Sequence, residues 1–240
     1  MIVLDTETIN KIENTEEDIC FQLSILDTDR NINITDNCKP KDYENMSIEA
    51  QEVTNITPDM IKDYPKIQDT KCWKYLNFIS KEENIIIGHN IPFDIEVIKR
   101  TGIDTSKFKL IDTLQIARFL NDNLGLPWES CRLSYLKYQH KLYNNREEIE
   151  KRYNITKKVQ AHDSLNDVLD CLLLWEYFRD TYNIKIEDAI KISTNPILLT
   201  YMNNGKYKGT KIEDLDYGTL KWNYENSWDA NVRFSCKKYL

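Results

Sequence analysis

Asp5, Glu7, Asp94, Asp167 and His162 lie in three short fragments of this sequence, each at a point where an apolar segment ends. The fragments are Ile2-Val3-Leu4-Asp5-Thr6-Glu7-Thr8, Gly88-His89-Asn90-Ile91-Pro92-Phe93-Asp94 and His162-Asp163-Ser164-Leu165-Asn166-Asp167. Burying several ionised carboxylates together costs free energy unless cations share their site. The fragments therefore predict bound divalent metal ions, and with them chemistry on phosphate esters.

Asp5 and Glu7 are two residues apart in a segment that we expect to be a strand. Their side chains would leave the same face of that strand, where the two carboxylates can hold one cation or bridge two. An isolated Asp-x-Glu pattern is also common where a strand simply ends in polar residues. The pair indicates a metal site only in combination with the other two fragments.

Asp94 falls in the first turn of an expected helix, on the same face as Val97 and Ile98. It could face a metal site, or it could be an acid that favours the helix dipole. Phe93 offers a ring on which a base can stack, and it could equally be a core aromatic.

Asp167 begins an otherwise apolar helical stripe, and no lysine or arginine is near it in the sequence. The stripe continues through Cys171, Leu174 and Phe178. His162 precedes this helix by about one turn, and a neutral imidazole beside a metal site is suited to take a proton from water. A lone histidine is more often structural, which is the role that we assign to the other two histidines, His89 and His140.

Hydrophobic periodicity predicts the elements that position these residues. Strands are expected at 2–8, 18–26, 31–35 and 84–88, with a further strand ending at 110–111, and helices at 91–100 (capped by Asn90), 113–121, 133–143, 146–152 and about 164–182. The first three strands should form an antiparallel meander. Strand–helix alternation then predicts an α/β fold with a mixed sheet covered by helices.

The pattern changes near Asn195-Pro196, and we expect a separate small module at 196–240. Lys206 and Lys208 alternate with Tyr207 in this tail, and Trp222 follows. The lysines could contact a phosphate backbone while the aromatic rings stack on bases. Alternatively, the aromatic side chains are the core of the module.

The three fragments resemble, in order, spacing and context, the ExoI, ExoII and ExoIII motifs of the DEDDh 3′–5′ exonucleases. This ribonuclease H-like family includes the epsilon subunit of DNA polymerase III and exodeoxyribonuclease X, and the H-x4-D form of the third motif is typical of its DEDDh branch. The resemblance implies an exonuclease domain at 1–182 with a five-stranded sheet, a connecting segment at 183–195, and a tail similar to those of exodeoxyribonuclease X-like proteins.

By this resemblance, Asp5, Glu7, Asp94 and Asp167 would hold two Mg²⁺ ions, for which Mn²⁺ can substitute, and His162 would be the general base. The enzyme would release nucleoside 5′-monophosphates from a 3′ end. The expected contacts to the substrate are Thr6, Thr8, Ile9, Asn90, Phe93, Lys206 and Lys208. Two stretches depart from the family pattern: 9–11 replaces a glycine-containing turn, and Thr54-Asn55 replaces a frequent His-Gly.

Composition fits a soluble globular protein, with 41% hydrophobic and 30% charged residues. No apolar run approaches a membrane span, only four residues precede Asp5, and the six cysteines form no CxxC pair. We therefore expect a cytoplasmic protein without a signal peptide or a structural zinc site. Cys20 and Cys171 should be reduced core residues.

The net charge of −7 argues at first sight against a nucleic-acid partner, although four of these charges belong to the proposed site. Seven Lys/Arg lie between Lys137 and Lys158, either as a solvated helical face or as a rim that follows phosphates.

Single-stranded DNA or a 3′ overhang is the favoured substrate, and a role in DNA repair is expected. An exoribonuclease or oligoribonuclease-like enzyme stays open, as does a non-catalytic module that binds nucleic acid or a protein partner. A polymerase complex is a further possible context.

Overall fold

The structure, a computed structural model, describes residues 1–126, 128–156, 163–203 and 205–240. His162, the expected general base, lies outside the described residues, as do Lys157 and Lys158. The chain divides into two compact units. The first unit comprises Met1–Thr113 and Arg132–Ile184, and the second comprises Leu114–Cys131 and Lys185–Leu240.

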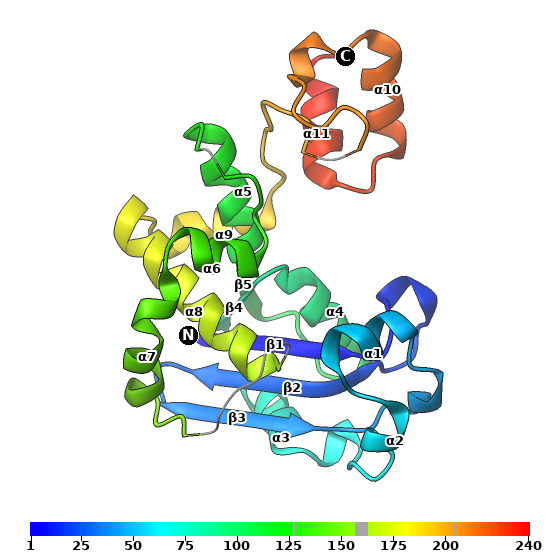
Figure 1. The fold of residues 1–240 in the computed structure, drawn as a ribbon, viewed down its shortest axis with the longest axis vertical. Coiled ribbons are helices and arrows are strands. Elements are labelled where there is room, and N and C mark those ends of the chain that lie inside the picture. The colour runs from blue at the N-terminus through cyan, green and yellow to red at the C-terminus, as the bar shows by residue number, and fades with distance from the viewer. Residues whose placement is uncertain (127, 157–162, 204) are drawn as a thin grey trace. The chain divides into compact units, whose positions relative to one another are not determined.

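The first unit contains a five-stranded sheet with the order β3-β2-β1-β4-β5 (Figure 1). The strands are β1 (Ile2–Thr8), β2 (Cys20–Asp27), β3 (Ile32–Asn37), β4 (Asn84–Gly88) and β5 (Phe108–Asp112). Strand β2 is antiparallel to both β1 and β3, whereas β4 is parallel to β1 and β5. The predicted meander and mixed sheet are confirmed.

Helices cover this sheet on both faces, and α8 (Ser164–Tyr182) packs against β1, β2 and β4. Side chains alternate along β1, so Ile2 and Leu4 join the core with α3 and α4 while Val3 and the acids at positions 5 and 7 take the opposite face. The other helices of this unit are α1 (Ile48–Thr54), α2 (Pro58–Ile61), α3 (Lys71–Ile79), α4 (Ile91–Arg100), α6 (Leu133–Gln139) and α7 (Arg146–Arg152).

Asn55 and Asn90 are among the asparagines of this unit that adopt the left-handed conformation. Asn55 ends α1 with φ 57°, and its N–H donates to the Gln51 carbonyl (2.9 Å). Asn90 is the N-cap residue of α4, as predicted, and has φ 73°, although its side chain makes no capping hydrogen bond. Its N–H instead donates to Asp112 Oδ1 (2.8 Å), which ties the start of α4 to the end of β5.

The second unit has its own apolar core, which lies among α5 (Thr113–Asn123), α9 (Ile186–Thr194), α10 (Tyr217–Asn226) and α11 (Ala230–Lys238) and the loops between them. Its buried members are Ile197, Leu199, Met202, Ile212, Leu220, Val232 and Cys236. Short 3₁₀ helices lie at Ile12–Asn14, Tyr43–Asn45, Ile67–Asp69, Leu142–Asn145 and Ile212–Asp214.

This division differs from the expected boundaries at 182 and 196. Residues 114–131 group with the tail because Gln115 exchanges hydrogen bonds with Asn231 (2.9 and 3.0 Å) and Asp122 accepts from the Thr200 N–H (2.8 Å). The expected connecting segment, 183–195, contains helix α9. These contacts join positions about 80 to 116 residues apart, which local periodicity does not detect.

None of the helices in the described ranges is long and apolar enough to cross a membrane. Cys20 and Cys171 are buried free thiols, as predicted.

Candidate active site

Three carboxylates from two elements meet at one end of the sheet in the first unit. Asp5 and Glu7 leave the same face of β1, and Asp167 lies in the first turn of α8, which packs across that strand. One ligand oxygen from each carboxylate lies within 4.8 Å of those of the other two. The structure thus brings together three of the four acids that the sequence predicts as metal ligands.

Asp94, the fourth predicted acid, is 4% exposed in the first turn of α4. Thr6 holds its carboxylate by two hydrogen bonds: the backbone N–H donates to Oδ1 (2.9 Å), and the hydroxyl donates to the same oxygen (2.7 Å). Thr6 faces α4 because it alternates with the acids on either side of it in β1. Its hydroxyl therefore orients an acid of the site, and a contact of Thr6 with substrate stays a prediction.

Burial and mutual repulsion make these acids hard to ionise. Burial raises the pKa of Asp5 well above its usual range, and the negative charges of Asp94 and Asp167 add to that rise. The pKa of Glu7 rises to about 8, first through burial and then through repulsion from Asp167. Burial also raises the pKa of Asp94 to about 7, although its hydrogen bonds from Thr6 oppose the rise.

This donor set fits divalent cations such as Mg²⁺, which prefer carboxylate oxygens. Within the described residues, no lysine or arginine forms an ion pair with Asp5, Glu7 or Asp94. A bound divalent charge would relieve the repulsion that raises the pKa values of these acids. The chemistry of the donors and their spacing therefore agree with a metal centre.

Two further acids, Asp112 and Asp163, act on the site and were not predicted as site residues from the sequence. Asp112 ends β5, raises the pKa of Asp94 by its charge and accepts the Asn90 N–H. Asp163 caps α8, where its carboxylate accepts the Leu165 N–H (3.1 Å), and its charge contributes to the raised pKa of Glu7. The sequence signals that could have identified them were the position of Asp112 at the end of a strand and that of Asp163 directly before a helix.

His89 has the structural role predicted for it. Its Nδ1 lies 2.9 Å from the Thr113 hydroxyl, which donates to the Gly88 carbonyl (3.1 Å). These contacts connect the end of β4 to the start of α5.

A cavity of about 180 Å³ opens beside Glu7. Thr8, Asn10, Thr54 and Phe93 are among the residues that line it. Two predicted substrate contacts, Thr8 and Phe93, thus lie at a recess next to the acids, and the Thr8 hydroxyl donates to the Asn10 carbonyl (3.0 Å). Phe93 is half-buried and also packs against the core of the unit.

Ile9, another predicted contact, is 2% exposed and belongs to the core. Its N–H donates to the Ile19 carbonyl, and its own carbonyl accepts the Ser47 N–H (both 2.9 Å). The residue leaves no surface for a nucleotide, contrary to the prediction, because β1 ends by folding this side chain inward. Asn90 is exposed, and Lys206 and Lys208 are exposed in the second unit.

A model of a known protein family matches most of this chain. The model of the exonuclease family named after ribonuclease T matches residues 2–174, which include all four acids and both elements of the three-acid cluster. The chain belongs to this exonuclease family.

Two curated relatives illustrate how far the likeness extends. Exodeoxyribonuclease 10 of Escherichia coli K12 is 25% identical over 203 residues, which cover 81% of this chain and 80% of that protein. The PolC-type DNA polymerase III of Pediococcus pentosaceus is 28% identical over 174 residues, 65% of this chain. The match spans only 12% of the polymerase.

Solved exonucleases share the fold. Exonuclease X, determined in complex with 5′ overhanging duplex DNA, superposes with a TM-score of 0.56 at 19% identity, covering 80% of this chain and 98% of that one. E. coli exonuclease I in complex with a dT13 oligonucleotide gives a TM-score of 0.52 at 20% identity, covering 74% and 40%. These likenesses agree with the mixed five-stranded sheet and its covering helices.

The described part of the basic stretch before residue 157 serves largely to hold this exonuclease domain together. Lys137 and Arg146 both pair with Asp170, each at 2.8 Å, and Asp170 is only 3% exposed. Arg152 pairs with Glu148 and Glu176 on exposed helix surfaces. The choice between a solvated helical face and a phosphate rim stays open for the stretch as a whole, since Lys157 and Lys158 lie outside the described residues.

Proposed function

We propose that this chain is a metal-dependent 3′–5′ exonuclease that hydrolyses DNA from a 3′ end and releases nucleoside 5′-monophosphates. The observation that carries the proposal is the cluster of Asp5, Glu7 and Asp167 beside the buried Asp94. A cluster of carboxylates is suited to gather cations at a reacting phosphodiester. Membership of the exonuclease family supports this assignment.

Asp5, Glu7, Asp94 and Asp167 would hold two Mg²⁺ ions, or Mn²⁺ in their place. When bound, such ions lower the pKa of water and neutralise charge on the phosphate and the leaving oxygen. Thr6 contributes by fixing the orientation of Asp94 through its two hydrogen bonds. His162 is proposed as the general base that accepts the proton of the attacking water, on the strength of its place in the third motif.

The proposed substrate is single-stranded DNA or a 3′ overhang. The likeness to exodeoxyribonuclease 10 over about four-fifths of both chains supports a deoxyribonucleotide polymer. Thr8 and Phe93 beside Glu7, and Asn90 at the start of α4, are proposed to contact the terminal nucleotide. We further propose a cytoplasmic enzyme of DNA repair, acting alone or with a polymerase.

Hydrolysis of end-labelled single-stranded DNA tests the proposal. Wild type should yield mononucleotides with Mg²⁺ and none with EDTA. Asp5→Asn should lower the rate by roughly a thousandfold or more, since metal ions supply several kcal/mol of charge stabilisation. Asp63→Asn, which changes an exposed carboxylate outside the site, should be fully active. An Asp5→Asn protein with wild-type activity would refute the mechanism.

Parallel digestion of matched DNA and RNA oligomers tests the choice of polymer, because the two differ at the 2′-hydroxyl. Faster release from DNA supports the proposal, whereas faster release from RNA would make the enzyme an exoribonuclease. Titration with Mg²⁺ or Mn²⁺ by calorimetry tests the alternative of a non-catalytic module. Absence of divalent-ion binding would favour that module.

A further inference from the structure

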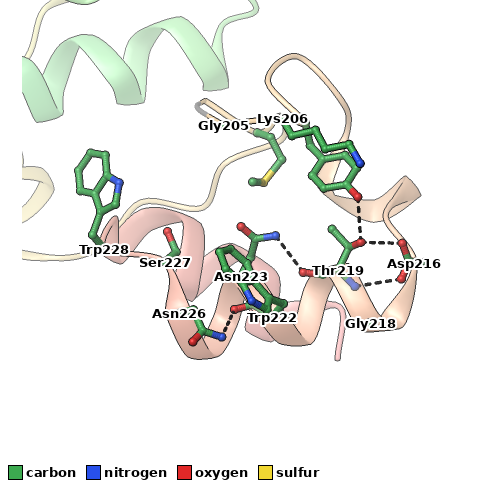
Figure 2. A pocket seen from close by; sticks show the side chains of 12 residues that line it. Gly205, Lys206, Asp216, Gly218, Thr219, Trp222, Asn223, Asn226, Ser227 and Trp228 are labelled. Atoms are coloured by element: carbon green, nitrogen blue, oxygen red, sulfur yellow. Dashed lines mark hydrogen bonds between the residues drawn. The ribbon is translucent and has the colours of Figure 1, made fainter.

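The second unit contains a cavity of about 610 Å³ that includes none of the acids of the active site (Figure 2). Lys206, in the loop before α10, lies on one side of it, and Trp222 and Asn223 of α10 lie on the other. Tyr207 also lines the cavity. Trp228, just beyond α10, stands at the end away from Lys206. The volume falls in the range of cavities that bind small molecules or single residues of a polymer.

The two tryptophans of this cavity are far more exposed than a structural role requires. Trp222 is 61% exposed and Trp228 is 76% exposed, whereas Trp175 in the first unit is fully buried. An indole left in water loses the free energy that burial would give, and clustered exposed aromatic rings mark contact surfaces. These rings are not part of the hydrophobic core of the second unit, whose buried members include Leu220, Ile212 and Val232.

The charge around the cavity suits a polyanion. Residues 196–240 carry seven Lys/Arg against five Asp/Glu, a net charge of +2 in a chain whose total is −7. Lys206 and Lys208 are exposed, and neither forms an ion pair with any described residue. The Lys206 ammonium lies 5.4 Å from the centre of the Tyr207 ring, so a cation and an aromatic face are presented together.

The acid that lines the cavity is already engaged. The Asp216 carboxylate caps α10, where it accepts the Thr219 N–H (2.9 Å) and the Thr219 hydroxyl (2.7 Å), as Figure 2 shows. The dipole of the helix and these two donors stabilise its charge. The lining also includes the neutral amides of the buried Asn223 and the exposed Asn226, a type of side chain that hydrogen-bonds to base edges.

We propose that this cavity is a second binding site for single-stranded DNA, separate from the active site. Bases would stack on Trp222 and Trp228 while the Lys206 ammonium contacts a phosphate. Alternation of lysines with aromatic rings is the arrangement by which proteins hold single strands without strong sequence preference. The choice of DNA as the occupant rests on the proposed exonuclease function, because a second site of this kind would retain the polymer that the enzyme shortens.

Binding of a fluorescein-labelled oligothymidylate to the full chain in EDTA tests the site without cleavage. Fluorescence anisotropy should show binding about tenfold weaker for Trp222→Ala and for Trp228→Ala, because a stacked base is lost. Trp228→Phe should bind nearly as well as wild type. Lys206→Gln should reduce the salt dependence of binding by the contribution of about one phosphate contact.

Matched controls come from the same helix. Tyr217 is 66% exposed and Lys221 is exposed, and neither lines the cavity. Tyr217→Ala and Lys221→Gln should bind the oligonucleotide as wild type does. Equal affinity of Trp222→Ala, Trp228→Ala and wild type would overturn the proposal, as would equal losses in the controls. Binding of an acidic peptide in place of the oligonucleotide, abolished by the same two variants, would overturn it in favour of a protein partner.

Kinetics separate this proposal from the function on which it rests. With a thymidine dinucleotide, which offers too few bases to occupy both sites, Trp222→Ala should have wild-type kcat and KM. With a long oligothymidylate its KM should rise while kcat changes little. If wild type hydrolyses neither substrate, the proposed function fails, and the binding measured in EDTA still decides whether the second site exists.

Discussion

Glu7 combines a raised pKa with partial access to solvent, so its titration should be visible in the stability of the protein. The pKa is raised to about 8, and burial is the largest cause, followed by repulsion from Asp167. In the unfolded chain a glutamate titrates at its ordinary value near 4.5. Between these two values the folded state holds a proton that the unfolded state has lost.

We predict that the metal-free protein becomes less stable as pH rises from about 5 to 8. The folded state binds more protons than the unfolded state in this window, so the free energy of unfolding falls with rising pH. Asp5 and Asp94 act in the same direction, because their pKa values are also raised. Mg²⁺ should reverse the trend, since it favours the ionised carboxylates, and its stabilising effect should grow with pH.

Thermal melts in EDTA and in MgCl₂ across this pH range check the prediction. Glu7→Gln should flatten the pH dependence in EDTA, raise the Tm at pH 8 and lose much of the stabilisation by Mg²⁺. Glu52→Gln, which changes an exposed carboxylate, should behave as wild type. A Tm that rises with pH in EDTA would contradict the assigned pKa directions.

At the scale of elements, the position of Asp167 depends on how the first turns of α8 are held. Asp170, three residues further along the helix, is 3% exposed and pairs with Lys137 of α6 and Arg146 of α7. Arg146 also donates to the Asn166 carbonyl (3.3 Å). These contacts fix α6 and α7 to the first turns of α8, the helix that carries Asp167.

We predict that Asp170→Ala destabilises the protein by roughly 3–5 kcal/mol, because it removes the buried carboxylate that two largely buried cations share and leaves Arg146 with Glu150 as its remaining ion-pair partner among the described residues. Urea denaturation would measure the loss. Glu148→Ala removes the exposed partner of Arg152 and should cost less than about 1 kcal/mol. Equal effects of the two substitutions would mean that the buried network contributes no more than a surface ion pair.

Much of this arrangement could be predicted from sequence because it depends on local pattern. The alternation that puts Asp5 and Glu7 on one face, and the helical spacing that directs Asp167 inward, are periodicities of two and 3.6 residues. Asn55, which ends α1, takes a left-handed conformation, and asparagine is among the few residues that tolerate it.

The features that sequence did not predict depend on contacts between distant positions. Ile9 was expected at substrate, but the bonds of its backbone to Ile19 and Ser47 turn the side chain into the core. Likewise, Gln115 hydrogen-bonds to Asn231 and is part of the second unit, although the strands of the first unit precede it directly in the sequence. A pairing across 116 residues leaves no trace in the composition of either segment.

In the molecule as a whole, each of the two compact units has a hydrophobic core of its own. The core of the first unit includes Leu76, Ile86 and Val97, and that of the second includes Leu220 and Val232. Units with separate cores generally unfold as separate cooperative units. All four acids of the proposed metal centre belong to the first unit.

We predict two transitions in differential scanning calorimetry, of which Mg²⁺ raises only the one that belongs to the first unit, because ligand binding stabilises the state that holds the site. Leu220→Ala should lower only the other transition, since removing a side chain that is 4% exposed costs roughly 2–5 kcal/mol in that core. Leu76→Ala supplies the reciprocal change in the first unit. A single transition that Mg²⁺ and Leu220→Ala both shift would show instead that the two cores unfold as one, and that a ligand on the second unit changes the stability of the active site.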